Sequence, residues 1–451
     1  MSALPEASLG ESVRILGTGL VPAVVRGLFA PRRWAMKQLT ALNADGRAVE
    51  VLSRVRARHG GEGVRLLGGR MVVLWGAEAI REVLDRSADV YASDAGAKAK
   101  GMCHFQPDAL TLSRGEDWRD RRAFNEFVLA GSERVHPFGE RFVTVAAAEV
   151  ASLRLDGELD WPAFERLFDR LTLRVIFGDR ARDDTALTER LEQLMHEANR
   201  IVGLKDSPVL HSFYGDLERH LRDAEPGSLL ARFADAPQSD RTRVVHQIPH
   251  WMFAMRDTLG ANTFRALAMV AGDAAVERRV RAEIAAADLA DAHSVDGLHY
   301  LEGCIEEAMR LWPTTPLLAR ETTRATTLCG ERLDEGTQVV IFNAFNHRDG
   351  GVPDADCFRP ERWPGAAGDY RLNHLSHGSQ DCPGGPLVRL LSKAVIARLL
   401  EAYTLTLTEP PLDASAPLPH MLDFFSIRLA ASARLPAAVA TGDGARSSVL
   451  L

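Results

Sequence analysis

The stretch of sequence that decides the fold is residues 375–385, which read LSHGSQDCPGG. It contains one cysteine, Cys382, and the apolar spacing of residues 386–401 behind it predicts an amphipathic helix. A cysteine just before a helix faces backbone N–H groups and the positive end of the helix dipole, and both favour the thiolate. Gly384 and Gly385 let the backbone approach a bound group closely. The stretch therefore predicts that Cys382 is a ligand or a nucleophile, with a buried cysteine at an ordinary helix start as the alternative.

The same stretch resembles the cysteine loop of the cytochromes P450, whose pattern F-x-x-G-x-(R/H)-x-C-x-G places a thiolate on haem iron. Cys382 and Gly384 match the last two fixed positions of the pattern. Leu375 stands in place of the usual Phe, and Gln380 in place of the Arg or His that contacts a haem propionate. Gln380 can still donate a hydrogen bond, but it carries no charge. The resemblance implies a haem b cofactor with the Cys382 thiolate as the axial ligand of iron.

Two further motifs of the family occur in the expected order before the cysteine loop. Residues 307–310 (EAMR) resemble its E-x-x-R helix motif, and residues 358–363 (FRPERW) resemble its F-x-P-E-R-W segment. Glu307 and Arg310 lie one helical turn apart, and the resemblance adds Arg362 as the third member of a structural charge network. A solvated ion pair is the alternative for the E-x-x-R motif alone. The order of the motifs favours the network.

Haem carries two propionates, which need cations at fixed places. Trp118 and Arg122 resemble the family's W-x-x-x-R helix, and Arg320 matches the arginine that follows the E-x-x-R helix. The resemblance implies that these three residues contact the propionates, and the guanidinium groups of the two arginines suit carboxylates. Arg119 and Arg121 are close enough in sequence to take the place of Arg122. An ordinary basic helix face is the alternative for this helix.

The apolar spacing of residues 242–271 predicts a long central helix, and the resemblance places that helix across the haem. The family pattern (A/G)-G-x-(D/E)-T fits residues 254–258 (AMRDT) if Met255 stands in for the glycine. A rival frame, residues 259–263 (LGANT), keeps the glycine and loses the acid. The spacing to residues 276–284, which resemble the family's following segment, favours the first frame.

This frame makes Asp257 and Thr258 the acid-alcohol pair that delivers protons during oxygen activation. Thr258 would orient a water molecule, and Asp257 would relay protons from solvent. Met255 is unusual at its position, where a bulky thioether would narrow the pocket. Arg256 is expected to point away and to pair with an acidic neighbour, with binding of a substrate carboxylate, as in the family's peroxide-using fatty acid hydroxylases, as the alternative.

The substrate-facing positions follow only by analogy with the family. They comprise the loop at 93–113, residues 314–318 and residues 421–427, and the specific candidates are Ala254, Met255, Leu317 and Phe425. Most of these residues are apolar, which implies a hydrophobic substrate. Each of them could equally belong to the core.

The resemblance implies a mostly α fold with a smaller β-rich part, with haem between the central helix and the helix after the cysteine loop. Apolar spacing predicts helices at 77–87, 118–130, 136–153, 161–178, 186–202, 227–235, 242–271 and 274–286, a hairpin at 64–75, and strands at 326–329, 338–343, 403–408 and 424–431. The expected division is an N-terminal extension at 1–35, a single haem domain at 36–439 and a flexible tail at 440–451.

Composition limits the classes of partner. The chain has 451 residues and a formal net charge of -7, and its basic residues are scattered, so nucleic acid is not expected as a partner. The apolar run at 15–30 is interrupted by Arg26, Pro22 and glycines, so we expect no membrane anchor. Five cysteines without a C-x-x-C pair indicate free thiols in a reducing compartment. A cytoplasmic protein is expected.

The resemblance implies a haem-thiolate monooxygenase of the bacterial type. It would insert one oxygen atom from O2 into a hydrophobic secondary metabolite, terpenoid or fatty acid, using electrons from a separate ferredoxin or flavodoxin with its reductase. Arg121, Arg389 and Lys393 are the candidate docking charges for that partner, with solvated surface as the alternative. A hydrogen peroxide-dependent peroxygenase, a redox-neutral haem-thiolate enzyme and a non-catalytic haem-binding sensor are the competing hypotheses.

Overall fold

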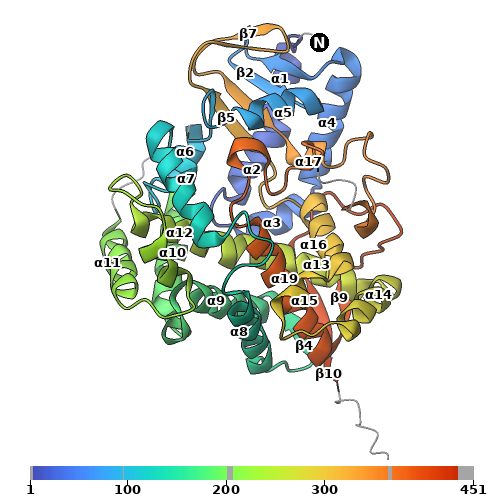
Figure 1. Cartoon of the computed structure of the whole chain (residues 1–451). Coiled ribbons are helices and arrows are strands. Elements are labelled where there is room, and N and C mark those ends of the chain that lie inside the picture. Colours follow the sequence, from blue (N-terminus) through green and yellow to red (C-terminus); the bar gives the residue numbers. More distant parts are fainter. Residues whose placement is uncertain (1–3, 95, 201–206, 364–367, 435–451) are drawn as a thin grey trace, which may run out of the picture.

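Helices make up most of the chain, and short strands gather at two places on either side of them (Figure 1). The computed structural model describes residues 4–94, 96–200, 207–363 and 368–434. The predicted mostly α fold with a smaller β part is therefore confirmed. The tail predicted at 440–451 lies outside the described residues.

The largest sheet joins early and late parts of the sequence, as the strand pattern predicts. Its order is β1-β2-β8-β5-β3, and β2 and β8 are parallel while the other pairs are antiparallel. The strands are β1 (Gly63–Leu66), β2 (Met71–Leu74), β3 (Tyr91–Ala92), β5 (Leu318–Thr322) and β8 (Gln338–Ile341). The predicted hairpin turns at Gly68 and Gly69, whose φ angles of 69° and 81° favour glycine.

The N-terminal segment packs against this sheet and is not separate from it. Its helices are α1 (Leu9–Ile15), η1 (Leu16–Leu20), α2 (Val21–Arg26), α3 (Arg33–Ala41) and α4 (Ala44–His59). The backbone of Arg65 in β1 donates to the Pro5 carbonyl and accepts from the Ala7 N–H, both at 2.8 Å. Leu4 and Ile15 are buried beneath the sheet and α4. The proposed boundary at residue 36 stays a prediction.

The helical bulk follows the predicted order with small shifts at its ends. It comprises α5 (Ala77–Asp85), α6 (Gly96–Met102), η2 (Leu110–Leu112), α7 (Gly115–Leu129), α8 (Gly139–Ser152), α9 (Trp161–Phe177), η3 (Asp179–Ala181), α10 (Thr185–Ala198), α11 (Pro208–Arg222), η4 (Leu229–Asp235), η5 (Val244–Gln247), α12 (Ile248–Phe253), η6 (Ala254–Leu259), α13 (Gly260–Gly272), α14 (Ala274–Ala286), α15 (Ala292–Asp296) and α16 (His299–Leu311). The chain continues through α17 (Asn343–Asn346), η7 (Pro360–Arg362), η8 (Gly378–Gln380), α19 (Gly385–Ala402) and η9 (Phe424–Ser426). Two smaller sheets contain β4 (Glu158–Asp160), β9 (Tyr403–Glu409) and β10 (Arg428–Ala433), and β6 (Thr326–Leu328) and β7 (Glu331–Leu333).

Three predictions of local structure need correction. The helix predicted at 227–235 is a 3-10 helix, η4. The strand predicted at 424–431 begins at Arg428, because the Asp423 side chain accepts from the Phe425 N–H and holds residues 424–426 in a 3-10 turn. The helix predicted at 242–271 is interrupted by η6, a π-helical segment, and such segments occur frequently at functional sites.

The core lies where α13 crosses the other long helices. All residues from Gly260 to Ala271 are buried, which is expected of a helix surrounded by others. The helices α9, α14, α16 and α19 pack around it, and α19 also contacts η6. Figure 1 shows α13, α16 and α19 together in the middle of the molecule. This packing brings the start of α19, and hence the cysteine loop, under the central helix.

In the four ranges that the structure describes, we find no helix long and apolar enough to cross a membrane.

Candidate functional site

The cysteine loop closes on itself just before α19. The backbone N–H of Cys382 donates to the Leu375 carbonyl at 3.0 Å, and the Gly385 N–H donates to the Cys382 carbonyl at 3.1 Å. Leu375, which replaces the family's Phe, lies beside Gly385 at the start of the helix. The loop therefore presents Cys382 from a backbone that its own hydrogen bonds fix.

Neighbouring elements hold the loop by close backbone contact. A side chain at Gly378, where φ is 67°, would lie 2.6 Å from the backbone of Leu84 at the end of α5. The Ser379 hydroxyl donates to the Leu84 carbonyl at 3.2 Å. A side chain at Gly131 would lie 2.6 Å from the carbonyl oxygen of Pro383. Only glycine permits these two approaches, so they fix the position of Cys382 relative to α5 and α7.

Burial controls the protonation of Cys382. It raises the pKa of the thiol, while the Gly384 N–H and the charges of Arg389 and Arg122 act in the opposite direction. Burial and the donors act on this pKa in opposite directions, so a thiolate at Cys382 stays a prediction. Coordination to a metal ion would deprotonate the thiol outright.

The space around the sulfur fits a bound group. Cys382 is surrounded by the fold and still keeps some accessible surface, and its neighbours Leu375 and Gly384 are partly accessible as well. A side chain at Gly384 would meet only Leu129 at 3.8 Å and the Cys382 sulfur at 4.0 Å, both ordinary contact distances. A soft thiolate ligand beside open space suits iron in a haem.

A buried cation without a carboxylate partner lies near this loop. Arg320 of β5 is 5% exposed, and its Nε donates to the Ser87 hydroxyl at 2.9 Å while its Nη1 donates to the Ala319 carbonyl at 3.0 Å. Within the described ranges no carboxylate pairs with it. Burial lowers the pKa of Arg320 to about 10. A buried, uncompensated cation is costly, so the position fits an anionic group such as a propionate.

Lys98 is a second interior cation, and the sequence analysis did not single it out. It lies on α6, and its Nζ is 3.4 Å from the Thr111 carbonyl. Burial and the charge of Arg320 lower its pKa to about 7. Asp94 opposes this shift, but its carboxylate is already paired with Arg114 at 2.6 Å. Lysine is rare in this chain, which makes Lys98 noticeable. However, α6 is short and has no periodic pattern, so the sequence does not show that the Lys98 side chain points inward.

Arg122 and Gln380 tie the cysteine loop to its neighbours. Arg122 donates through Nη1 to the Asp381 carbonyl at 2.7 Å, pairs with the Asp381 carboxylate, and donates through Nε to Glu126 at 2.7 Å. Gln380 donates to the Ser87 carbonyl at 3.3 Å. Trp118 lies one turn before Arg122 on α7 and is partly buried. The guanidinium of Arg122 is therefore already neutralised, in contrast to that of Arg320.

The central helix turns one accessible face to the interior. Side chains at helical spacing keep accessible surface along α12 and η6, namely His250, Phe253, Ala254, Asp257 and Thr258. Met255 is 6% exposed and belongs to the main core cluster. Met255 thus has packing partners in the core, and its effect on the pocket stays a prediction.

The two candidate alcohols have different surroundings. The Thr263 hydroxyl is fully buried, donates to the Leu259 carbonyl at 2.8 Å and lies 2.9 Å from the Ser392 hydroxyl. Thr258 keeps accessible surface, and its hydroxyl makes no hydrogen bond within the described chain. Burial raises the pKa of Asp257 to about 7, with the charge of Arg256 opposing. Asp257 can therefore exchange a proton near neutral pH, beside a free hydroxyl.

Arg256 is buried and turned toward acidic side chains, as predicted. It pairs with Asp169 at 2.5 Å and with Asp257 at 3.2 Å. The sequence reasoning expected one acidic neighbour, and the structure brings several together from α9 and α10.

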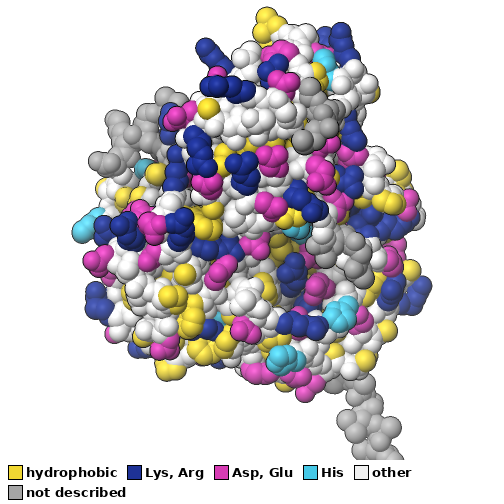
Figure 2. Space-filling model, turned by 45° about the horizontal axis from the view of Figure 1, so that its top comes forward, with side chains coloured by type: hydrophobic (Ala, Val, Ile, Leu, Met, Phe, Trp, Pro, Cys, Tyr) yellow, Lys and Arg dark blue, Asp and Glu magenta, His cyan; other side chains and the backbone are white. Residues whose placement is uncertain are grey.

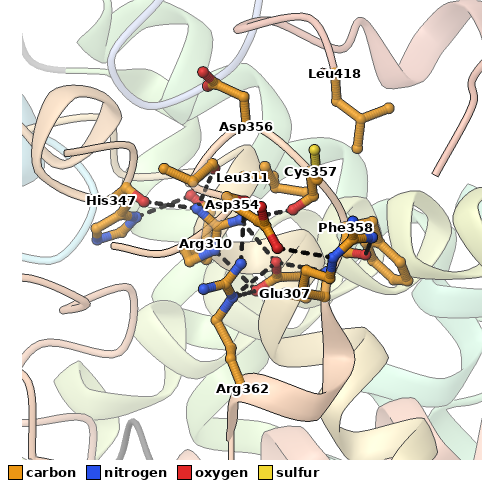
Figure 3. A network of polar contacts seen from close by, with 12 residues as sticks. Glu307, Arg310, Leu311, His347, Asp354, Asp356, Cys357, Phe358, Arg362 and Leu418 are labelled. Atoms are coloured by element: carbon orange, nitrogen blue, oxygen red, sulfur yellow. Dashed lines mark hydrogen bonds and ion pairs between the residues drawn. The ribbon is translucent and has the colours of Figure 1, made fainter. Parts of the chain in front are cut away.

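The charges of the E-x-x-R and P-E-R-W motifs meet in one network (Figure 3). Glu307 accepts from Arg310 Nε at 2.8 Å and Nη2 at 2.7 Å, and from Arg362 Nε at 3.0 Å on both oxygens. Arg310 also donates to the carbonyls of His347 and Ala355 at 2.6 and 2.7 Å. Glu307 and Arg310 are completely buried. The network therefore fastens α16 to the segment that leads to the cysteine loop.

Two residues predicted to contact substrate, Leu317 and Phe425, pack against other parts of the protein. Leu317 borders the N-terminal helices, where it lines a small cavity with Ala23 and Phe342. Phe425 packs against Phe424 with tilted rings whose centroids are 4.2 Å apart, and the Arg33 guanidinium lies over the Phe425 ring. The structure thus gives these two side chains packing partners, and their contact with substrate stays a prediction.

Two of the three docking charges named from the sequence are not on the surface. Lys393 is fully buried and pairs with Asp296 and Glu302, and Arg121 is buried beside Asp108. Arg389 is half-buried and donates to Glu306 at 2.6 Å. Both the docking interpretation and the alternative of a solvated surface are therefore wrong for Lys393 and Arg121. Figure 2 shows acidic and basic side chains interspersed on the face that it displays.

Comparison with known proteins agrees with this geometry. The family model described as cytochrome P450 matches residues 188–421, more than half of the chain. Cytochrome P450 monooxygenase ptmK of Penicillium ochrochloron is 25% identical over 43% of this chain and 42% of its own length. Piperic acid synthase CYP719A37 of Piper nigrum is 26% identical over 52% and 53%, and steroid 21-hydroxylase of Felis catus is 38% identical over 27% and 25%.

The chain thus spans between a quarter and about half of the length of these relatives. Members of the matched family hold haem through a cysteine thiolate. The family match contains the Glu307 network, the central helix and the cysteine loop, and by these features together the chain belongs to the cytochrome P450 family.

Proposed function

We propose that the protein is a haem-thiolate monooxygenase that inserts one oxygen atom from O2 into a hydrophobic small molecule. The observation that carries the proposal is a chain of contacts. Arg320, a buried cation without a carboxylate partner, bonds Ser87, and Ser87 bonds Gln380 two residues before Cys382. This chain of contacts links a position suited to an anion with the loop that carries the thiol, which supports a haem site between them.

Several side chains would hold haem b. Cys382 would bind the iron as a thiolate, and Gly384 would let the backbone lie against the ring. Arg320 and Lys98 would hold propionates, because both are interior cations without a carboxylate bond. Trp118 and Arg122 remain candidate contacts, and Arg122 would take a propionate in place of Asp381.

The accessible face of the central helix would serve oxygen activation. Haem, when bound, supplies the reductive activation of O2. Thr258 would hold a water molecule through its free hydroxyl, and Asp257 would pass protons to that water. Phe253 and Ala254 on the same face are apolar and would contact the substrate, which supports a secondary metabolite, terpenoid or fatty acid. The acid-alcohol pair favours O2 over hydrogen peroxide as the oxidant.

The spectrum of the reduced, carbon monoxide-bound protein tests the proposal. We expect the Soret band of a haem-thiolate, and we expect Cys382→Ala to lose it. Cys329→Ala, at a buried cysteine in the turn between β6 and β7, is the matched control and should keep the band. A protein without the band, or one that keeps it after Cys382→Ala, would contradict the proposal.

The electron donor is proposed to be a separate ferredoxin or flavodoxin with its reductase, acting in the cytoplasm. Turnover reconstituted with each donor system, compared with hydrogen peroxide alone, would test this. Substrate class is best approached by a screen in which compounds displace the haem water. Turnover with peroxide alone would instead favour a peroxygenase.

A further inference from the structure

We propose that Arg256 and three carboxylates, Glu165, Asp169 and Glu192, form the solvent-side branch of the proton path that ends at Asp257. This inference rests on the proposed function. It adds residues from α9 and α10, outside the central helix, to the proton delivery of this chain. Arg256 acts in it as a positioning residue.

The geometry is a guanidinium surrounded by carboxylates. Arg256 Nε lies 2.5 Å from Asp169, Nη1 lies 3.2 Å from Asp257, and Nη2 lies 3.1 Å from Glu192 and 3.7 Å from Glu165. The three nitrogens thus engage four carboxylates, and Glu192 and Glu165 share Nη2. Because Arg256 is buried in the π-helical segment, it fixes all four acids at the same point of the central helix.

The cluster carries more acid than base. Four carboxylates face one buried guanidinium, and the other charged groups are peripheral. Arg33 lies 3.6 Å from Glu165 and is mostly exposed, Arg166 acts on Asp169 from the same helix, and His196 lies 3.6 Å from Glu192. Repulsion between carboxylates in a poorly solvated site favours the retention of a proton.

The pKa directions agree with this charge balance. Burial raises the pKa of Glu165 and Asp169, and it raises that of Asp257 to about 7, with the three other carboxylates adding to the shift at Asp257. The Oδ2 atom of Asp257 is buried and has no hydrogen-bond partner within the described chain. That oxygen is a suitable place for the exchangeable proton.

The cluster also connects solvent to the interior. The Glu192 side chain is 47% exposed, whereas that of Asp257 is 20% exposed and belongs to the accessible inner face. A proton would enter from water at Glu192, pass to Asp257 through water molecules between the carboxylates, and leave to the water held by Thr258. Each carboxylate then returns to its starting state, and no electron moves. Arg256 does not carry the proton, since its neighbours raise its pKa further.

Infrared spectroscopy of the purified protein tests the inference without turnover. The carboxyl C=O band that Asp257→Asn removes is assigned to Asp257 and titrated with pH. We expect Glu192→Gln and Asp169→Asn each to move its midpoint to lower pH by about one unit, because each removes a negative charge nearby. Arg256→Gln should move the midpoint to higher pH, and Arg256→Lys should largely restore it.

The matched control is Glu277→Gln, which breaks a carboxylate-arginine pair with Arg281 on α14. It should leave the Asp257 band unchanged. In turnover with the donor proteins, Glu192→Gln should increase the solvent isotope effect on product formation and release more peroxide per electron pair, and Glu277→Gln should not.

A purely structural role for Arg256 would lower stability and leave the Asp257 titration unchanged in Glu192→Gln and Asp169→Asn. That result overturns the inference. It can be measured even if Arg256→Gln fails to fold, because it comes from the other two variants. Failure of the proposed function would appear separately, as loss of the thiolate band in the carbon monoxide spectrum. The infrared titration does not depend on that band.

Discussion

At the scale of single residues, surroundings decide which of two similar side chains has a function. Thr258 and Thr263 lie five positions apart on the central helix, and both fit a family frame. The structure uses the hydroxyl of Thr263 within the core and leaves that of Thr258 accessible. The family motif can be matched to either threonine, so the sequence alone does not decide between them. The packing of the fold does.

We expect Thr258→Ala to divert electrons into free peroxide, because the water that needs its hydroxyl is no longer oriented. Coupling, measured as product formed per electron pair, should fall roughly tenfold or more. Thr263→Ala should keep the coupling and lower the free energy of unfolding by about 1 kcal/mol, because buried hydrogen bonds are lost. Equal coupling in Thr258→Ala and the wild type would show that the second frame is the functional one.

Lys98 makes the stability of the haem-free protein depend on pH. Its pKa is about 7 in the folded state and 10.5 as the ordinary value, so between these values the unfolded chain binds more protons. The free energy of unfolding should therefore rise from about pH 7 to pH 10, by at most about 1.4 kcal/mol per unit. Urea unfolding at several pH values should show that Lys98→Met removes this part of the slope. An identical slope in Lys98→Met would mean that the ammonium is well solvated.

At the scale of elements, the Glu307 network determines how α16 meets the segment before the cysteine loop. The sequence placed its three charges at recognisable spacings, but the carbonyl partners of Arg310 come from a loop without a pattern. Such contacts depend on chain folding over tens of residues, so no local motif predicts them. The same applies to Asp169 and Glu192, whose helices meet Arg256 only through packing.

We expect Glu307→Gln to lower the free energy of unfolding by about 3–5 kcal/mol, because it leaves Arg310 as a buried cation without a carboxylate. Denaturant unfolding and retention of haem would measure the effect. Glu361→Gln is the control, since this exposed glutamate pairs only with the exposed Arg279. Its loss should cost less than about 1 kcal/mol. Similar losses in both variants would contradict a structural role for the network.

At the scale of the whole molecule, the N-terminal segment belongs to the packing of the sheet. Ile15 is buried with Val64 of β1 and Phe342 after β8, while Leu9 on the same helix is 74% exposed. Its burial could not be read from the sequence, because the glycine-rich run at 15–30 lacks a clear helical period. The packing partners are strands far along the chain.

We expect Ile15→Ala to lower the free energy of unfolding by about 2–4 kcal/mol, because it leaves a cavity under the sheet. Leu9→Ala should change it by less than about 0.5 kcal/mol, since that side chain is already in water. Thermal or urea unfolding of the two variants provides the comparison. Equal stability of Ile15→Ala and the wild type would mean that the segment detaches without cost.

The sequence by itself determined the family features of this protein. The order of the motifs, the cysteine before a helix and the helical periods depend on neighbours within a few turns, so one chain suffices to read them. Only the tertiary structure decided which charges remain without partners. Arg122 and Arg320 look alike in sequence, yet one meets Asp381 and Glu126 while the other is enclosed without a carboxylate bond. Desolvation and pairing depend on contacts between distant segments, and those exist only after the chain has folded.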